Sequence, residues 1–255
     1  MACESLLVRS GELLLGDHLI PMDESQRTLR VGATLVFGGV LISLVAGFFH
    51  PNQAPANDHA AAFAEYAASD VWIAVHLGQF VGMMMIVAGL VALFPVLDAR
   101  PGRSGWAGRF GAVAAVLALG LYGVLQAVDG VALKHAVDAW ATAPKSERAA
   151  RFASAEAIRW LEWSVRSYHS YLLGASFLLY GTVVTSTAGL PRPIGYIMGL
   201  SGLAYIAQGW VIGSQGFSSA TAAPTLAGII LVLTWSVWLL ANAWRKFTAH
   251  IFPTT

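Results

Sequence analysis

The stretch Ala157–Thr185 is long and apolar enough to cross a bilayer, yet it carries ionisable side chains in its first half. Glu162, Arg166 and His169 follow one another at spacings of four and three residues, which places them on one face of a helix. Ionisable groups inside a spanning helix are costly and usually face a protein interior or a water-filled cavity. We therefore expect this face to look inward and to mark a candidate site.

Polar residues in other apolar runs share the depth of Glu162 and Arg166, whereas His169 lies closer to the middle of the membrane. At about 1.5 Å per helical residue, the polar residues of the second and third runs fall within roughly 8–12 Å of the outer end. Within each run they repeat every three or four residues, so that they lie on one stripe of the helix. They are His76 and Gln79 in the second run, Gln126 and Asp129 in the third, and Tyr205 and Gln208 in the outer half of the fifth. Because hydrocarbon would leave these groups unsatisfied, we expect them to meet one another or water.

Residue type assigns a role to each member of this predicted cluster. Asp129, Glu162 and His76 are the candidate catalytic residues, since a desolvated carboxyl group or a histidine can exchange protons near neutral pH. Arg166 is expected to hold an anionic or carbonyl group, and both carboxylates are predicted to face it. The further candidates for substrate binding are Gln126, Gln79, Gln208, Tyr205 and His169. A structural interpretation stays open, in which buried ion pairs fix helix register and carry no chemistry.

Metal and cofactor chemistry is constrained by the same residues. The single cysteine, Cys3, excludes an internal disulfide and a cysteine-based metal cage. His50 is followed by Pro51 and is interpreted as the end of the first helix. No metal site is predicted. The cofactor is left open, with haem b held by His76 and His169 as an alternative that their different depths disfavour.

The overall composition excludes an ordinary soluble domain. Hydrophobic residues make up 56% of the chain and charged residues 11%, whereas a soluble domain has about 25% charged residues. The formal net charge of +1 gives no indication of nucleic-acid binding. The polar cluster must therefore be held by membrane helices, and the lipid bilayer is the expected partner.

Six apolar runs, each near the roughly 20 residues that a span requires, predict an all-α integral membrane bundle. A polar extension, 1–30, precedes the transmembrane domain, 31–247, and a tail, 248–255, follows it. Met22 offers an alternative start within the extension. The runs are Val31–Phe49, Val71–Leu97, Phe110–Leu133, Ile158–Thr185, Ile194–Ile212 and Pro224–Trp244.

Basic residues in the short connections predict the orientation of the bundle. Lysine and arginine precede the first run, occupy the second and fourth connections and follow the sixth run, whereas the first and fifth connections contain neither. The positive-inside rule then places both termini in the cytoplasm. The basic residues on which this prediction depends are Arg27, Arg30, Arg100, Arg103, Arg109, Arg192, Arg245 and Lys246.

The third connection is the exception to this charge pattern, because it is basic but would lie outside. It contains two alanine-rich stretches, Ala136–Ala143 and Ser146–Ala157, on either side of Pro144. We expect these stretches to form a short helical lid on the outer surface. No other connection is predicted to have much structure of its own.

Four short motifs resemble a family of six-span bacterial membrane proteins that is known only as a domain of unknown function. The resemblance covers most of the chain from about Arg30 onward and implies a multi-pass protein of the bacterial inner (plasma) membrane. It transfers no activity, since the family has none assigned. The motifs are Phe49-His50-Pro51, His76-Leu77-Gly78-Gln79, Gln126-Ala127-Val128-Asp129-Gly130 and Trp160-Leu161-Glu162.

These observations favour a membrane protein whose polar cluster binds or acts on a small or lipophilic molecule. An accessory subunit with a self-paired cluster, a haem or quinone redox protein and a carrier are the alternatives. A carrier would need a polar pathway through the inner halves of the runs, which are almost free of ionisable residues. The sequence leaves open whether the protein is an enzyme, which ligand it takes and whether it forms oligomers.

Overall fold

The computed structural model describes residues 22–97, 103–188 and 190–251, so most of the predicted extension 1–30 and residues 252–255 of the tail lie outside it. Within these ranges every regular element is a helix. The α-helices are α1 (Met22–Phe48), α2 (His59–Ala67), α3 (Trp72–Leu97), α4 (Arg103–Gln126), α5 (Lys134–Ala141), α6 (Arg148–Ser186), α7 (Arg192–Gln215) and α8 (Ala222–Ile251). A π-helix, η1 (Ala127–Leu133), joins α4 to α5, and a 3-10 turn, η2 (Ser219–Thr221), precedes α8.

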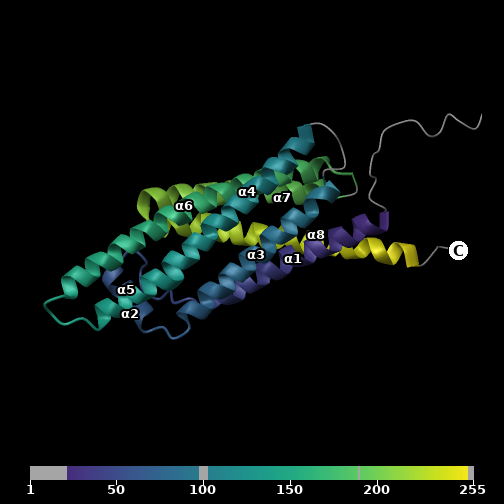
Figure 1. The fold of residues 1–255 in the computed structure, drawn as a ribbon. Coiled ribbons are helices and arrows are strands. Elements are labelled where there is room, and N and C mark those ends of the chain that lie inside the picture. The colour runs from purple at the N-terminus through teal and green to yellow at the C-terminus, as the bar shows by residue number, and fades with distance from the viewer. Residues whose placement is uncertain (1–21, 98–102, 189, 252–255) are drawn as a thin grey trace, which may run out of the picture.

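Six long helices form an elongated bundle (Figure 1). α1 packs along α3, α6 packs against both α4 and α7, and α8 contacts α7 and α1. α1 begins and α8 ends at the same end of the bundle, where Arg30 Nε donates to the Ala243 carbonyl oxygen at 3.4 Å. α2 and α5 lie at the opposite end, which we call the α2/α5 end.

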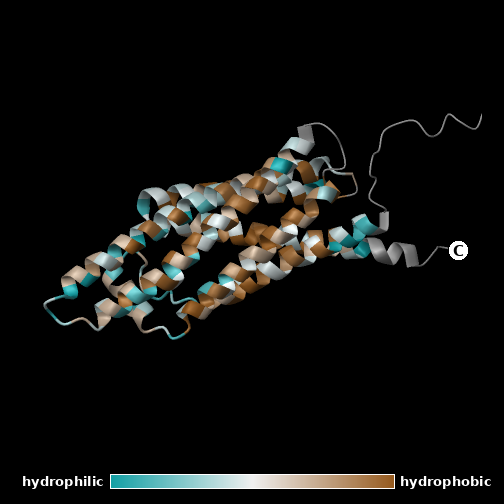
Figure 2. Ribbon diagram, in the orientation of Figure 1, coloured by the Kyte–Doolittle hydropathy of each residue, from teal (hydrophilic) through white to brown (hydrophobic). Residues whose placement is uncertain are grey.

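The six predicted apolar runs coincide with these long helices, the third continuing from α4 through η1, and the prediction of an all-helical, membrane-type fold is confirmed. Five helical segments are long and apolar enough to cross a membrane, and Figure 2 shows apolar residues dominating the middle of the bundle. The sixth long helix, α6, falls short of that apolarity because it contains more polar side chains. Several of these are buried inside the protein. They are Arg159, Glu162, Ser167, His169, Ser170 and Ser176.

Glycine allows the long helices to approach closely where no hydrophobic driving force acts between them in lipid. A Cβ atom added to Gly181 of α6 would lie 2.6 Å from the Gly195 carbonyl oxygen of α7. One added to Gly202 of α7 would lie 2.5 Å from the Gly174 carbonyl oxygen of α6. The backbones of α6 and α7 therefore touch at two separate points, which fixes the position of α6 in the bundle.

The first connection contains α2, which corrects the prediction that only the third connection is structured. Asp58 caps this helix, with its Oδ1 accepting from the Ala61 N–H at 3.2 Å. α2 packs on α5 and on the first turns of α6, and it encloses a second, smaller core at this end of the bundle. The buried residues of that core are Ala62, Phe63, Tyr66, Trp72, Leu133, Val137 and Ala155.

The third connection is helical, as predicted, but it forms no separate lid. η1 and α5 continue α4 without a break, and α6 runs uninterrupted from Arg148 to Ser186. Only residues 142–147, with Pro144 among them, separate the two helices. The alanine-rich stretches have high helix propensity and contain no breaker toward the spans, so each span simply continues past the apolar region. The result is a helical hairpin in which Trp140 and Phe152 pack with ring centroids 5.6 Å apart.

Candidate functional site

His76 of α3 and Asp129 of η1 meet at the α2/α5 end of the bundle. His76 Nε2 lies 3.0 Å from Asp129 Oδ2, and His76 Nδ1 lies 2.7 Å from the Trp72 carbonyl oxygen. Because a carbonyl oxygen can only accept, Nδ1 carries a proton and Nε2 is the atom that faces the carboxylate. The Trp72 indole N–H donates to the Asp129 carbonyl oxygen at 3.1 Å, so backbone and side chain together hold α3 against η1. The structure brings these two predicted residues together.

The backbone around Asp129 departs from a regular α-helix. Residues 127–133 form a π-helix inside an otherwise continuous α-helix, a feature that is often found at functional sites. The neighbouring Gly130 faces His76 so closely that an added Cβ would lie 2.7 Å from the His76 Cβ. Any larger residue at this position would push α3 and η1 apart and separate the histidine from the carboxylate.

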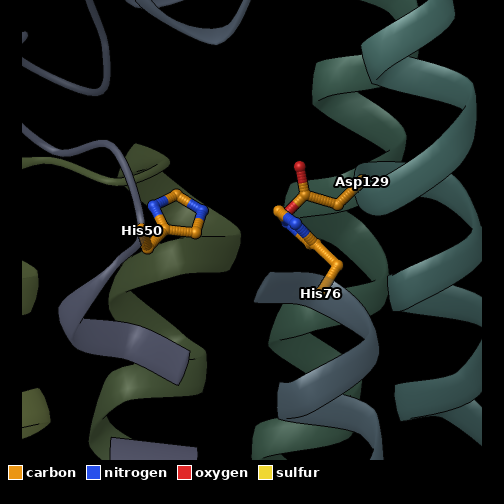
Figure 3. A group of neighbouring side chains, drawn as sticks. All are labelled: His50, His76 and Asp129. Carbon is orange, nitrogen blue, oxygen red and sulfur yellow. The ribbon is translucent and has the colours of Figure 1, made fainter. Parts of the chain in front are cut away.

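His50 approaches the same pair from the end of α1, as Figure 3 shows. One ligating atom from each of His50, His76 and Asp129 lies within 4.8 Å of the other two. His50 Nδ1 is 2.7 Å from the Pro51 carbonyl oxygen, so here too Nδ1 is the donor and Nε2 keeps a lone pair. Burial lowers the pKa of His50, outweighing the opposite effect of the Asp129 carboxylate, and this favours the neutral ring.

Glu162 pairs with Arg159 of the same helix, three residues earlier, and both side chains are buried. Arg159 Nη2 also donates to the Tyr66 hydroxyl of α2 at 3.1 Å and lies 3.5 Å from the Ala56 carbonyl oxygen. Burial raises the pKa of Tyr66 to about 12, although the Arg159 charge opposes the shift. The hydroxyl therefore stays protonated, and Arg159 ties α6 to α2 and to the segment that precedes it.

The prediction that Asp129 and Glu162 face Arg166 is wrong. Glu162 has Arg159 as its partner, and Asp129 has His76. Among the residues that the structure describes, no carboxylate lies within salt-bridge distance of Arg166. Arg159 and Arg166 stand three residues before and four residues after Glu162, so both could reach it along the helix. Arg159 forms the ion pair with Glu162, and the Tyr66 hydroxyl of α2 accepts a second hydrogen bond from it.

Arg166 instead lines a partly open cavity of about 450 Å³ between the long helices. Three of the predicted substrate-binding residues, Gln79, Tyr205 and His169, line it as well, together with Tyr122. The rest of the wall is mostly apolar and comes from α1, α3 and α8, with Val40, Leu44, Met83, Ile86, Ile229 and Val232 among its residues. Small-molecule sites commonly have this size and this mixture of apolar walls with a few polar groups.

Two buried polar atoms of the cavity wall have no partner within the described ranges. They are Ser43 Oγ and His169 Nε2. His169 Nδ1 donates to the Ala118 carbonyl oxygen at 2.9 Å, so Nε2 is left as an acceptor. Buried polar atoms are nearly always hydrogen-bonded, and an unsatisfied one requires an explanation. Both atoms have almost no accessible surface, so a bound molecule with donor and acceptor groups would satisfy them only after the wall rearranges.

Gln126 and Gln208 do not line this cavity. Gln208 accepts from Ser170 Oγ at 3.1 Å and donates to Thr225 Oγ1 at 2.7 Å, which connects α6, α7 and α8. Gln126 lines a separate groove of about 260 Å³ between α3, α4 and η1, where His76 also lies. The predicted cluster is thus divided between two places, and Gln208 serves the packing of helices.

The two histidines proposed as haem ligands are also separated. His76 lines the groove beside η1, whereas His169 lines the cavity with Arg166. His76 donates its Nδ1 proton to Trp72 within α3, and His169 donates its Nδ1 proton to Ala118 of α4. The structure therefore does not direct them toward one another across a shared cavity.

Sequence reasoning missed several polar residues of these sites. His50 was interpreted only as a helix end, although Phe49-His50-Pro51 stands at the same depth as His76 and Asp129. Arg159 is not among the predicted site residues, although its spacing of three residues from Glu162 indicates a pair. For Tyr66 the available signal was the pattern Asp58 followed by an alanine-rich stretch, which indicates a capped helix.

The model of one protein family matches residues 31–243, which is most of the chain, and its description is Domain of unknown function (DUF4386). No curated protein and no solved structure matches the chain. The matched range extends from the first turns of α1 almost to the end of α8, so it includes every residue of the sites described above.

Proposed function

The chain belongs to the family with the domain of unknown function DUF4386, and we propose that it binds an amphipathic molecule with an anionic or carbonyl head group. The head group would lie beside Arg166 and the apolar part against the aliphatic wall of the cavity. The observation that carries the proposal is a cation on the wall of a 450 Å³ cavity, with no carboxylate of the described residues in salt-bridge range. A charge in such surroundings favours an anionic partner.

The polar groups of the cavity wall indicate which chemical groups the bound molecule carries. Arg166 and Ser43 can donate hydrogen bonds to a carboxylate, phosphate or carbonyl oxygen. His169 Nε2 can accept one from a hydroxyl or amide group of the same molecule. The chemical class is therefore an acyl chain with a polar, oxygen-rich head, which a membrane protein can take directly from the surrounding lipid.

Replacing Arg166 with leucine is expected to weaken the binding of oleate by roughly 10- to 100-fold. Oleate is the simplest probe of this class, with one carboxylate and one apolar chain. The expected loss corresponds to about 1.5–3 kcal/mol, the contribution of hydrogen bonds to a charged group. Equilibrium binding of radiolabelled oleate to the purified protein in detergent measures the effect. Arg166→Lys should lose less, because it keeps the charge but not the planar geometry.

Two controls separate a site from nonspecific partition into detergent or lipid. Arg151→Leu removes an exposed arginine of α6 that pairs with Glu147 four residues away, and it should bind oleate as the unaltered protein does. Oleyl alcohol, which has the same chain without the charge, should compete poorly. If Arg166→Leu and Arg151→Leu bind equally well, or if the alcohol competes as well as unlabelled oleate, the cavity does not recognise the head group.

The purely structural alternative applies to one part of the predicted cluster. Glu162 and Arg159 are paired directly and buried, so we assign them a structural role, although Glu162 was predicted to be catalytic. A self-paired cluster without a cavity would support an accessory subunit for the whole chain. The cavity beside Arg166 and the unpartnered Ser43 and His169 atoms support ligand binding instead.

We place the protein in the bacterial inner membrane, with α6 as a sixth span and both ends of the described chain on the cytoplasmic side. Support comes from the charge pattern of the connections and from the position of the start of α1 beside the end of α8. A periplasmic reporter enzyme fused after Thr255 should then be inactive and a cytoplasmic one active. Activity of the periplasmic reporter alone would reverse the orientation.

A further inference from the structure

Three side chains that can ligate a metal converge at the α2/α5 end from three separate segments. His50 follows α1, His76 lies in α3 and Asp129 lies in η1, and their ligating atoms are all within 4.8 Å of one another (Figure 3). We propose that His50, His76 and Asp129 bind a divalent transition-metal ion, with Zn²⁺ as the first candidate. This site is separate from the Arg166 cavity, so the inference does not depend on the proposed function.

The hydrogen bonds of both histidines favour metal binding. In each ring Nδ1 donates to a backbone carbonyl oxygen at 2.7 Å, from Pro51 for His50 and from Trp72 for His76. Histidines that bind metals usually donate their other N–H group in this way, which fixes the ring and its tautomer. The arrangement leaves a lone pair on His50 Nε2, whereas His76 Nε2 donates a proton to Asp129 Oδ2 and becomes a ligand when the metal displaces that proton.

The carboxylate supplies the charge that a metal ion requires. Asp129 Oδ2 contacts His76, but Asp129 Oδ1 is buried and has no partner among the described residues. The ion pair of Arg159 with Glu162 has no net charge, so it does not neutralise the Asp129 carboxylate. Buried charges are normally paired or coordinate a metal, and a dication between Asp129 and the two rings would neutralise this carboxylate.

The distances require only a small closure around an ion. Zinc bonds to nitrogen and oxygen are about 2.0–2.2 Å long, so neighbouring ligand atoms in a tetrahedral site stand about 3.3 Å apart. The 3.0 Å between His76 Nε2 and Asp129 Oδ2 is close to this value, and no pair exceeds 4.8 Å. His50 is half-buried and lies beyond the last residue of α1, so it can move inward without disturbing a helix.

The kinds of ligand select the class of metal. Two imidazoles and one carboxylate suit Zn²⁺ or Fe²⁺, whereas Ca²⁺ and Mg²⁺ prefer oxygen ligands alone. Three protein ligands leave at least one position of the ion for water or for a bound molecule. The groove that His76 lines between α3 and η1 is bordered by the exposed side chains of Leu77 and Val131, so an apolar molecule could reach the ion from the lipid side.

Zinc titration of the full-length protein tests the inference. The protein is purified in detergent through a tag without histidine, stripped with a chelator and dialysed against Zn²⁺, and the bound metal is measured by mass spectrometry. We expect one ion per chain, and at least 100-fold weaker binding after His50→Gln or Asp129→Asn. Co²⁺ in place of Zn²⁺ should give the visible absorption of a low-coordinate site, which His50→Gln should abolish.

His59→Gln is the matched control. His59 Nδ1 lies 2.8 Å from Glu156 Oε1, so this residue makes the same kind of histidine–carboxylate contact at the same end of the bundle, but among the described residues it belongs to no three-residue ligand group. Its variant should bind zinc as the unaltered protein does. His50→Gln is the decisive variant because His50 is half-buried and its loss should leave the helical fold intact, which circular dichroism verifies. Absence of stoichiometric zinc from the unaltered protein, equal zinc affinity in His50→Gln, or equal loss in His59→Gln would each overturn the inference.

Discussion

Replacing Glu162 with alanine is expected to lower the free energy of unfolding by about 3–5 kcal/mol, since it leaves a buried arginine without its counter-ion. Arg159 and Glu162 are both nearly inaccessible to solvent, with side-chain exposures of 4% and 3%. Arg159 would keep its hydrogen bond to the Tyr66 hydroxyl, but a hydroxyl group cannot neutralise its charge. Thermal unfolding of the purified protein in detergent measures the loss as a lower midpoint temperature.

The chain offers a matched control for this effect in the same helix. Arg151 and Glu147 form an ion pair four residues apart whose side chains are 53% and 55% exposed. Exposed pairs contribute about 0–1 kcal/mol, so Glu147→Ala should leave the midpoint almost unchanged. The double variant Arg159→Leu with Glu162→Leu should recover much of the loss, because neither charge then remains buried. Equal effects of Glu147→Ala and Glu162→Ala would contradict the buried pair.

The second large effect is expected where α6 and α7 touch through glycine. Gly181→Ala and Gly202→Ala should each destabilise the protein by about 1–3 kcal/mol, because a new methyl group would press against a backbone carbonyl oxygen of the facing helix. The facing oxygens, of Gly195 and Gly174, lie 2.6 and 2.5 Å from the added atoms. Since backbone cannot rotate away as a side chain can, the helices must separate. The two contacts are distinct, so the double variant should lose about the sum.

Gly120→Ala controls for the substitution itself. Gly120 lies inside α4, and a Cβ atom added there would meet nothing within 4 Å. Alanine is the better helix former by about 1 kcal/mol, so this variant should be as stable as the unaltered protein or slightly more stable. The midpoint temperatures of the three variants give the comparison. A Gly181→Ala protein as stable as Gly120→Ala would show that α6 and α7 are not in contact there.

The architecture could be predicted because length and apolarity decide it locally. Each apolar run is long enough to span a bilayer, and each coincides with a long helix, the third continuing from α4 through η1. The inward face of α6 could also be predicted, since hydrocarbon does not accept Glu162 or His169, and both are buried in the structure. The depth of the polar residues along their helices correctly predicted that His76 lies close to Asp129.

The pairing of charges could not be predicted, because it depends on tertiary neighbours. Arg159 and Arg166 are both within reach of Glu162 along the helix, and only the position of Tyr66 on α2 distinguishes them. α2 itself is nine residues long, and so short a helix is stabilised by packing rather than by its own sequence. His50 joins His76 and Asp129 only because the chain turns inward directly after α1, a geometry that sequence spacing does not contain.

The central claim is that the cavity beside Arg166 takes the head group of an amphipathic molecule. Photocrosslinking with a diazirine-bearing analogue of oleate, followed by mapping of the labelled peptides, tests it most directly. The account predicts labelling at wall residues from several helices, such as Val40, Met83 and Val232, and a large reduction of that labelling in Arg166→Leu. Labelling confined to lipid-exposed positions such as Leu200 and Leu203, and unchanged in Arg166→Leu, would contradict it.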